Sequence, residues 1–348
     1  KIPNPDLKWE RTGQFDIGLD LGLFNNRLRI TTDYYKKKTT DLLYSVAVPA
    51  TSGYQTMLKN IGSIENQGYE LSIESDNLTG AFSWTTAFNI AFNRNKVLEL
   101  GGEEYKEMAE GDGHLKTGSV RRLIVGEPIG VFYGYRFDGI FQNEEECKQQ
   151  TSSASPIGVG LRRYKDLNGD GKVDAANDRE ILGDANPKFF GGLTNTFAYK
   201  GFELNVFLQY SYGNKILNYN AMELENPTGG QNAYADMVNR WTPENPSNIY
   251  PKATTNRALL VSDRFIEDGS YLKLKTLSLS YSFPKINLKH IQGLRLYVTG
   301  QNLLTWTKYR GYDPEVSYRG ASTLEAGEDF GGYPQSRTFM FGIKLDIK

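Results

Sequence analysis

An oxygen-rich turn in the middle of the chain has the residue types and spacing that bind a divalent cation. Residues 166–174 read Asp-Leu-Asn-Gly-Asp-Gly-Lys-Val-Asp. This order resembles an EF-hand loop, with oxygen ligands at alternate positions and glycine at the sharp bend. Ca²⁺ takes roughly six to eight oxygen ligands, and a tight turn brings alternate positions together. The sequence therefore predicts a structural Ca²⁺ in loop 166–178, held by Asp166, Asn168, Asp170, the carbonyl of Lys172, Asp174 and Asp178.

The end of this motif leaves an alternative open. Asn177 stands where an EF-hand has its bidentate glutamate, and Asp178 follows one residue later. Either Asp178 supplies that ligand through a bulge, or the segment is an Asx-rich turn that binds no ion. No flanking amphipathic helices are predicted, which favours a loop staple over a signalling EF-hand. No organic cofactor is predicted.

Aromatic side chains in the long connections are the candidate substrate-binding residues. Flat rings stack on the apolar faces of sugars and also hold peptides, although loop packing and interfacial anchoring use the same residue types. The candidates are Tyr219, Tyr234, Trp241, Tyr250, Trp306, Tyr309 and Tyr312.

No combination of residues predicts an enzyme. Glu103, Glu104, Glu107 and Glu110 form an acidic run that is typical of a solvated loop, and glycines flank the Asp112 and His114 pair. The chain has no G-x-S-x-G elbow, phosphate-binding loop or histidine-rich ligand set.

The C-terminal segment shows which element dominates the chain. Phe339, Phe341, Ile343, Leu345 and Ile347 alternate with small or polar residues, as in a strand with one apolar face. The pattern recurs and predicts about eleven antiparallel strands. They lie near 15–23, 27–35, 69–75, 82–93, 119–125, 129–137, 190–199, 202–212, 271–283, 294–302 and 337–348.

The connections alternate between short and long. Short ones lie near 24–26, 76–81, 126–128, 200–201 and 284–292, and long ones near 37–66, 94–118, 138–188, 213–268 and 303–335. Outer-membrane barrels have short periplasmic turns and long extracellular loops, whereas a soluble sandwich mixes both at each end. The pattern favours an all-β, antiparallel transmembrane barrel.

Composition agrees with a barrel and excludes other classes. The net charge of −1 gives no reason to expect a nucleic-acid partner. No apolar run approaches the ~18 residues of a membrane helix, and this excludes a helical membrane protein. Tyrosine (22) and phenylalanine (18) are abundant, as in the aromatic girdles of barrels.

Strand parity predicts that the chain is part of a larger barrel. Single-chain bacterial barrels have an even number of strands, and open sheet edges are not tolerated in lipid. An odd count therefore places Lys1 in an extracellular loop and makes residues 1–348 the C-terminal portion of a barrel.

Ordered motifs along the chain resemble SusC/RagA-type TonB-dependent transporters. They lie at 33–43, 60–62, 66–71, 88–95, 134–141, 187–195, 269–275, 300–306 and 311–315. The resemblance implies a plugged barrel of about 22 strands. It also implies an outer membrane of the Bacteroidetes kind. The expected activity is import of a large oligosaccharide or oligopeptide.

The resemblance also implies partners and a lumen. A plug and the N-terminal barrel strands would precede this chain, TonB would act through that region, and a SusD-like lipoprotein would close over the loops. Charged residues on the less apolar strand faces would then point into the lumen, namely Asp16, Asp20, Arg27, Arg29, Glu70 and Glu74. The alternative hypothesis is a secreted, calcium-braced glycan-binding module.

Overall fold

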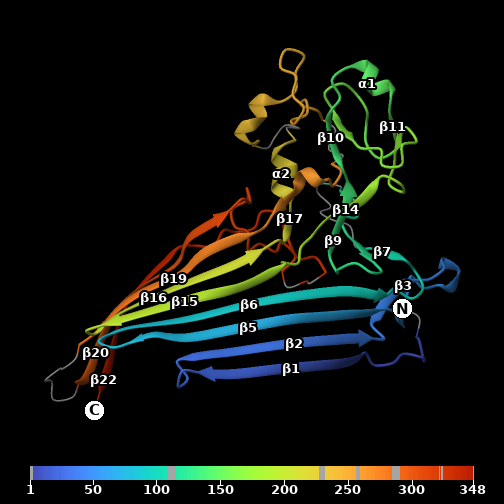
Figure 1. Cartoon of the computed structure of the whole chain (residues 1–348). Helices are drawn as coiled ribbons and strands as arrows, with labels where there is room; N and C mark the ends of the chain where they lie inside the picture. The colour runs from blue at the N-terminus through green and yellow to red at the C-terminus, as the bar shows by residue number, and fades with distance from the viewer. Residues whose placement is uncertain are drawn as a thin grey trace.

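A single antiparallel sheet forms the largest part of the molecule (Figure 1). The computed structural model describes residues 3–108, 115, 117–226, 232–255, 259–283, 291–320, 322 and 324–347. Nine strands pair in the order β1-β2-β5-β6-β15-β16-β19-β20-β22, and the sheet is not closed. The strands are β1 (Arg11–Leu23), β2 (Leu28–Thr40), β5 (Ser63–Thr79), β6 (Phe82–Glu99), β15 (Phe189–Tyr199), β16 (Phe202–Tyr212), β19 (Tyr271–Ser282), β20 (Ile291–Thr307) and β22 (Thr338–Ile347).

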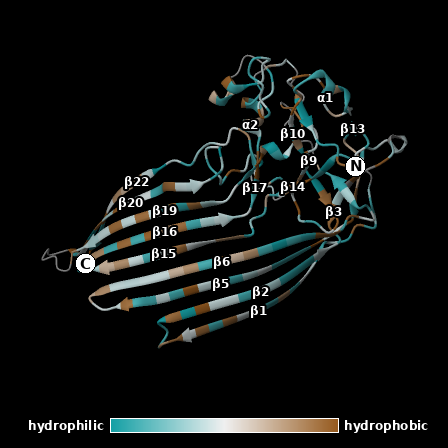
Figure 2. Cartoon of the chain, turned by 45° about the horizontal axis from the view of Figure 1, so that its top comes forward, coloured by the Kyte–Doolittle hydropathy of each residue, from teal (hydrophilic) through white to brown (hydrophobic). Residues whose placement is uncertain are grey.

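Strand register carries one apolar face across the whole sheet. Leu19 pairs with Thr32, and Thr32 pairs on its other side with Leu71. Leu71 in turn pairs with Ile90, and farther across the sheet Leu193 pairs with Leu208. We call this side the apolar face and the other side the polar face. The alternation is visible as bands of colour along the strands in Figure 2. Phe341 on the apolar face is 83% exposed, and a continuous surface of this kind is unstable in water.

Aromatic residues gather at both ends of the apolar face. Near the short turns, Phe202 lies 4.5 Å from Tyr281, and near the other end Phe189 lies 5.0 Å from Tyr212, measured between ring centroids. Ten residue steps along β15 separate the two groups, about 34 Å at ~3.4 Å per residue. Because barrel strands are tilted by ~40°, this length along the strand corresponds to about the height of the apolar band of a membrane barrel.

The connections sort by end, as the sequence predicts. The short turns at 24–27, 80–81 and 200–201 close one end. Lys200 and Gly201 both have positive φ, which matches the twist of a two-residue hairpin. The long connections, at 41–62, 100–188, 213–270 and 308–337, lie at the other end, together with the N-terminal residues (Figure 1).

Two of the predicted barrel strands are wrong. Residues 119–125 and 129–137 leave the sheet, and among the described residues the sheet has nine strands rather than about eleven. Part of the second segment forms β9, which pairs with β14 within the connection 100–188. Val131 and Phe132 of β9 are buried. Period-two alternation marks any strand, so it does not distinguish the membrane wall from a ladder inside a loop. Since these two strands are not in the sheet, the predicted short connection 126–128 and the separate long loops 94–118 and 138–188 are wrong as well.

Several sheet strands are longer than predicted at the long-loop end. β2 continues to Thr40 and β6 to Glu99. Beyond the apolar band, water can reach both faces, so the alternation that marks a strand in sequence is lost while the backbone pairing continues. The last predicted residue, Lys348, lies outside the described residues.

The long connections fold into a loop assembly with its own core. Leu115, Phe132, Leu217, Met222 and Phe265 come from two connections and are buried together. No described helix is both long and apolar enough to cross a membrane. The elements of the assembly are β3 (Leu43–Ala47), η1 (Ala50–Ser52), β4 (Thr56–Asn60), β7 (Tyr105–Glu107), β8 (Arg122–Ile124), β9 (Val131–Tyr135), β10 (Phe137–Ile140), α1 (Glu144–Lys148), β11 (Thr151–Ser152), β12 (Arg162–Tyr164), β13 (Lys172–Val173), β14 (Arg179–Asp184), β17 (Lys215–Asn218), α2 (Tyr219–Leu224), η2 (Ala235–Asn239), η3 (Asp263–Phe265), β18 (Ile266–Asp268) and β21 (Glu328–Asp329).

Candidate functional site

The polar face collects charged and hydroxyl side chains from neighbouring strands. Thr31 donates to Asp20 at 2.6 Å, and Arg29 pairs with Glu74 at 3.0 Å and with Asp76 at 3.4 Å. The strand register places five of the six residues predicted for the lumen on this face, namely Asp16, Asp20, Arg29, Glu70 and Glu74. Arg27 lies in the turn before β2 and donates to the carbonyl oxygens of Asp76 and Asn77.

A cluster of charges joins the polar face to the last long connection. The ammonium of Lys273, a β19 residue that is 1% exposed, lies 2.6 Å from both Asp313 and Glu315. Lys275 pairs with Glu315 at 2.9 Å, and the hydroxyl of Tyr271 donates to the same carboxylate. We call these five residues the loop anchor, because they hold residues 313–315 against the sheet wall.

Burial and charge act in opposite directions on Glu315. Burial raises the pKa of this carboxyl group, but hydrogen bonds and charge attraction from Lys273 and Lys275 outweigh it. The net pKa of Glu315 is about 2, so the group is ionised at neutral pH. A β-bulge between Leu274 and Thr276 accompanies the cluster at Lys275.

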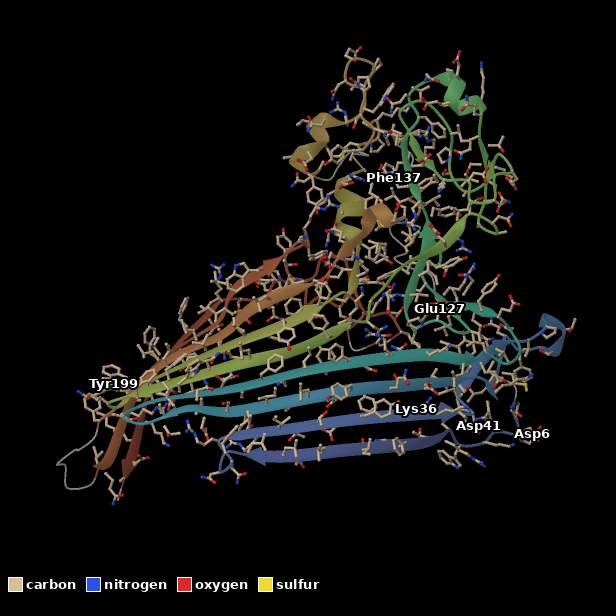
Figure 3. The ribbon with its side chains drawn as sticks, in the orientation of Figure 1. Asp6, Lys36, Asp41, Glu127, Phe137 and Tyr199 are labelled. Atoms are coloured by element: carbon tan, nitrogen blue, oxygen red, sulfur yellow. The ribbon has the colours of Figure 1, made fainter. Side chains whose placement is uncertain are left out.

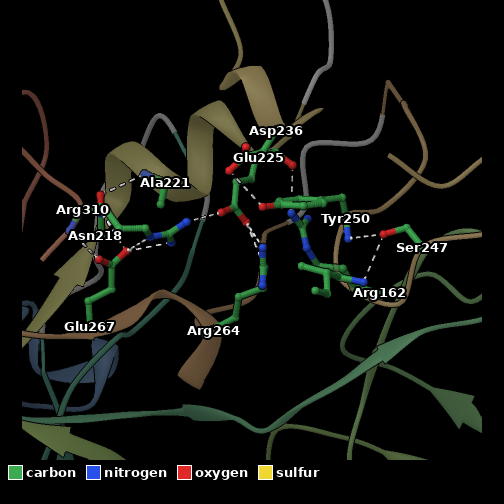
Figure 4. Close-up of polar contacts among 11 residues, drawn as sticks. Arg162, Asn218, Ala221, Glu225, Asp236, Ser247, Tyr250, Arg264, Glu267 and Arg310 are labelled. Atoms are coloured by element: carbon green, nitrogen blue, oxygen red, sulfur yellow. Dashed lines mark hydrogen bonds and ion pairs between the residues drawn. The ribbon is translucent and has the colours of Figure 1, made fainter. Parts of the chain in front are cut away.

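A second network joins three long connections deep in the loop assembly (Figure 4). Glu225, at 0% exposure, pairs with Arg264 at 2.7 Å and with Arg310 at 2.8 Å. Arg310 continues to Glu267 at 2.8 Å, and Arg162 donates to the carbonyl oxygen of Glu225. Because the buried carboxylate of Glu225 has two opposite charges as partners, the network fixes the connections relative to one another.

A third buried pair ties the connection 100–188 to the connection 308–337. Arg121 pairs with Glu328 at 2.8 Å, and both side chains are almost fully buried. The guanidinium also donates to the carbonyl oxygens of Gly130 and Ala326, and it lies 4.2 Å from the centre of the Phe132 ring. The sequence predicts neither this pair nor the two networks, because the partners are far apart in the chain and isolated loop charges carry no pattern.

The predicted substrate-binding aromatics divide into four groups. Tyr219 and Tyr309 are 0% and 5% exposed, so in this structure they pack inside the loop assembly and are not available to a solute. Trp306 pairs in register with Leu272 and therefore lies on the apolar face, which is a correction to its predicted substrate-binding role. Tyr312 is 81% exposed.

The three remaining aromatics lie in the connection 213–270. The indole of Trp241 donates to Gln142, and the hydroxyl of Tyr250 donates to Asp236. Tyr234 packs against the core of the loop assembly. These contacts position the rings but do not bring them into one binding site.

The predicted calcium loop is a compact turn closed by its own carboxylates. Asp166 accepts hydrogen bonds from the backbone amides of Gly169 and Gly171, and the buried Asp178 accepts from Leu167 and Asp174. The carboxylates of Asp170 and Asp174 stand in the same turn. Within the described ranges, no group of three or more His, Cys, Asp or Glu side chains is arranged to hold a metal ion. The donor set is oxygen-rich, as Ca²⁺ requires, and the calcium site stays a prediction.

Two of the acidic residues that were considered for catalysis, Glu103 and Glu107, form ion pairs with basic side chains. Glu103 pairs with Lys106, and Glu107 pairs with Arg122 and Arg179. Glu110, Asp112 and His114 lie outside the described residues.

The comparison with known families decides the class of the protein. The family described as TonB dependent receptor-like, beta-barrel matches residues 1–303. The chain belongs to the TonB-dependent receptor β-barrel family. TonB-dependent receptor P3 of Formosa agariphila is 41% identical over 349 residues, which cover 98% of this chain and 34% of the relative. TonB-dependent receptor SusC of Bacteroides thetaiotaomicron is 30% identical, and the match covers 100% of this chain and 33% of the relative.

Solved structures of the same family superpose on this receptor chain. The RagAB peptide transporter has a TM-score of 0.78 at 27% identity, over 99% of this chain and 36% of that one. The RagAB peptide importer in its open-open state has a TM-score of 0.80 at 27% identity, over 98% of this chain and 35% of that one. The receptor chain thus spans about a third of the length of the relatives it matches.

These matches confirm the resemblance and the location. The chain is of SusC/RagA type and lies in the outer membrane of a Bacteroidetes-like bacterium. The apolar face is the surface that such a barrel presents to lipid, and a lipid-facing wall excludes the secreted glycan-binding module.

Proposed function

We propose that the transporter containing this chain imports a large polar nutrient, an oligosaccharide or an oligopeptide, across the outer membrane. One observation carries the proposal. The sheet separates a charged, hydrogen-bonded polar face from an apolar face, and every long connection gathers at one end of it. A wall of this kind provides a wet path on one side and contact with lipid on the other.

The polar face is the proposed solute path. Asp16, Asp20, Arg29, Glu70 and Glu74 would line the lumen, where charge is solvated. An arginine turned toward lipid would cost about 2–4 kcal/mol near the midplane. The name RagAB peptide importer, given to a similar protein, supports an oligopeptide as one of the two solute classes. The exposed Tyr312 and the partly buried Trp241 are the best-placed aromatics for solute contact.

The partners are part of the same proposal. A SusD-like lipoprotein would close over the loop assembly, and TonB would act on a plug contributed by another part of the transporter. The loop assembly suits such a lid, because its buried ion pairs and its own core give a partner a fixed surface. The transporter makes or breaks no bond in the solute.

We also propose that loop 166–178 binds a structural Ca²⁺. The observation that supports the site is the alternate spacing of oxygen donors in a turn whose backbone is already closed by Asp166 and Asp178. The ion would add a cross-link to the connection 100–188.

The import proposal is tested in cells that lack the full-length transporter. The strain is complemented with the wild-type gene or with a gene whose TonB-interacting segment is deleted, and uptake of labelled oligosaccharide and oligopeptide pools is measured. We expect one pool to enter only with the wild-type gene. Equal uptake of every pool by all three strains would contradict import.

A further inference from the structure

Arg162 is a positive charge in the loop assembly that pairs with no carboxylate among the described residues. It lies in β12, beside the buried side chain of Glu225 (Figure 4). Both carboxylate oxygens of Glu225 are taken, because Oε2 pairs with Arg264 and Oε1 pairs with Arg310. Nη2 of Arg162 therefore donates to the main-chain carbonyl oxygen of Glu225 at 3.2 Å, and Nε is buried with no hydrogen-bond partner in the described part of the chain. Burial lowers the pKa of this guanidinium, as expected for a charged group without a counter-ion.

The network around Arg162 carries an excess of positive charge. It holds three guanidinium groups and two largely buried carboxylates, namely those of Arg162, Arg264, Arg310, Glu225 and Glu267. Asp236, the third carboxylate drawn in Figure 4, is exposed and accepts a hydrogen bond from Tyr250. In the sequence, the segments 227–231 and 256–258 add no acidic residue. The buried part of the network therefore lacks one negative charge.

Arg162 lines a small pocket between two long connections. Ser155 and Tyr164 line it from the connection that contains β12, and Asn226 and Thr254 line it from the connection that contains α2. Hydroxyl and amide side chains can all donate hydrogen bonds, so this lining suits an anion. The pocket has a volume of about 30 Å³, and one ordered water needs roughly 10–15 Å³. It therefore has room for about two oxygen atoms, and a sugar ring does not fit.

The pocket is on the side of the molecule where the long connections gather. Figure 3 labels Phe137 of β10, the register partner of Tyr164, within the loop assembly, and Tyr199 at the opposite end of the sheet. Arg162 keeps part of its surface exposed, so an anion from the surrounding solution can reach it.

We propose that this pocket binds one carboxylate group, which supplies the missing counter-charge of Arg162 and links the two connections. A guanidinium binds a carboxylate through two parallel N–H donors, which match the anion in both shape and charge. A carboxylate carries one negative charge, equal to the excess in the network. A phosphate group carries about −1.5 to −2 at neutral pH and has more oxygen atoms than the pocket holds.

The carboxylate has two possible sources with the same chemistry. It belongs either to a small free acid or to one end of a larger solute, whose remainder stays outside the pocket. The inference goes beyond the proposed import, because the pocket requires only the anionic group and no transport step.

The test uses the full-length transporter in detergent and measures hydrogen exchange while each probe is titrated. The first probes are acetate, the neutral isostere acetamide, and chloride, which matches the ionic strength of acetate. Two further pairs separate the sources of the carboxylate. They are N-acetylated triglycine with its C-terminal amide, and galacturonic acid with galactose.

The variants remove the proposed counter-charge or a neighbouring one. Arg162→Gln removes the unpaired guanidinium. The matched control is Arg163→Gln, since Arg163 is the next residue, is partly exposed and pairs with Asp138 and Glu146. Heat-modifiable gel migration establishes that each variant is folded.

Acetate is expected to slow exchange over residues 155–164 and 250–255 in wild type and in Arg163→Gln, whereas acetamide and chloride are not. Arg162→Gln is expected to raise the half-saturating acetate concentration by at least about tenfold, because a hydrogen-bonded charge is lost. Tighter binding of acetylated triglycine or of galacturonic acid than of acetate would identify a peptide or a sugar acid as the source. Equal binding of all three acids would identify a site for free acids.

Three results would overturn the proposal. These are no protection by any acid, equal protection by acetate and its neutral isostere, and an unchanged acetate titration in Arg162→Gln. Should Arg162→Gln fail to fold, Tyr164→Phe keeps the charge and removes one donor, and we expect an increase of about two- to tenfold in the half-saturating concentration. A wild-type value for Tyr164→Phe would then count against the site. No TonB is present, so a negative result leaves the import proposal standing.

Discussion

The nine-stranded sheet and the loop assembly place their apolar side chains in opposite ways. In the sheet, each residue pairs with a neighbour set by register, and the apolar side chains face outward. In the loop assembly, Phe132 and Leu217 come from different connections and are buried together. The sheet is built for lipid on one side, and the assembly is built like a small soluble domain.

The difference determines where buried charge is found. The apolar face excludes charged side chains from its described strand residues between the two aromatic groups, because lipid offers no partner for them. The loop assembly buries Arg121, Glu328, Glu225 and Arg264 in pairs. Such pairs contribute little net stability but become costly to break. The two regions should therefore respond differently to the same kind of substitution.

Arg121→Met is expected to have the largest effect. It leaves Glu328 buried without its nearest cation, and breaking a buried pair costs about 3–5 kcal/mol. Hydrogen exchange of the full-length transporter should show faster exchange over residues 119–135 and near 328. The control Arg163→Met removes a partly exposed pair with Asp138 and should cost at most about 1 kcal/mol. Equal exchange in the two variants would show that the pair does not hold the connections together.

Leu277→Arg tests the sheet. Leu277 lies near the middle of β19 on the apolar face, and Ser278 beside it lies on the polar face. An arginine near the membrane midplane costs about 2–4 kcal/mol when it faces lipid. We expect a reduced folded fraction for Leu277→Arg by heat-modifiable gel migration, and near wild-type folding for Ser278→Arg. The reverse order would mean that the two faces have been assigned the wrong way round.

Acidification should release the loop anchor. The pKa of Glu315 lies at about 2, below its ordinary value of 4.5. Its contribution to anchoring is therefore complete above about pH 4.5 and is lost as the pH falls toward 2. Pepsin cleavage within 308–337 should increase over that range in wild type. Glu315→Gln should be cleaved more readily at every pH, with a flatter profile. A wild-type profile that is equally flat would contradict the role of this carboxylate.

Calcium removal should have the smallest and most local effect. If loop 166–178 binds Ca²⁺ with the affinity of an extracellular module, the Kd is about 10⁻⁴–10⁻³ M. Chelation should then increase protease cleavage within 138–188 and leave the sheet unchanged. Asp170→Asn should reproduce the effect without chelator, whereas Glu145→Gln on α1 should not. Identical cleavage with and without Ca²⁺ would identify the segment as an ion-free Asx turn.

The sequence predicted the sheet better than the loop assembly. Eight strands and the terminal one have a short-range pattern that repeats every two residues, since one face meets lipid throughout. The same pattern in residues 129–137 misled the prediction, because β9 is a buried strand within a connection. The aromatic residues Tyr219 and Tyr309 misled it too, since nothing in their local sequence shows that they are buried.

The amino-acid sequence by itself determined the all-β class, the apolar face, the sorting of connections and the family. Each of these depends on residue types at short and regular spacing. Only the tertiary structure decided which loop charges meet. Lys273 is 40 residues from Asp313, and Arg121 is 207 residues from Glu328. The physical reason is that an ion pair needs only that two side chains end close together in space, and no periodicity in the chain records that closeness.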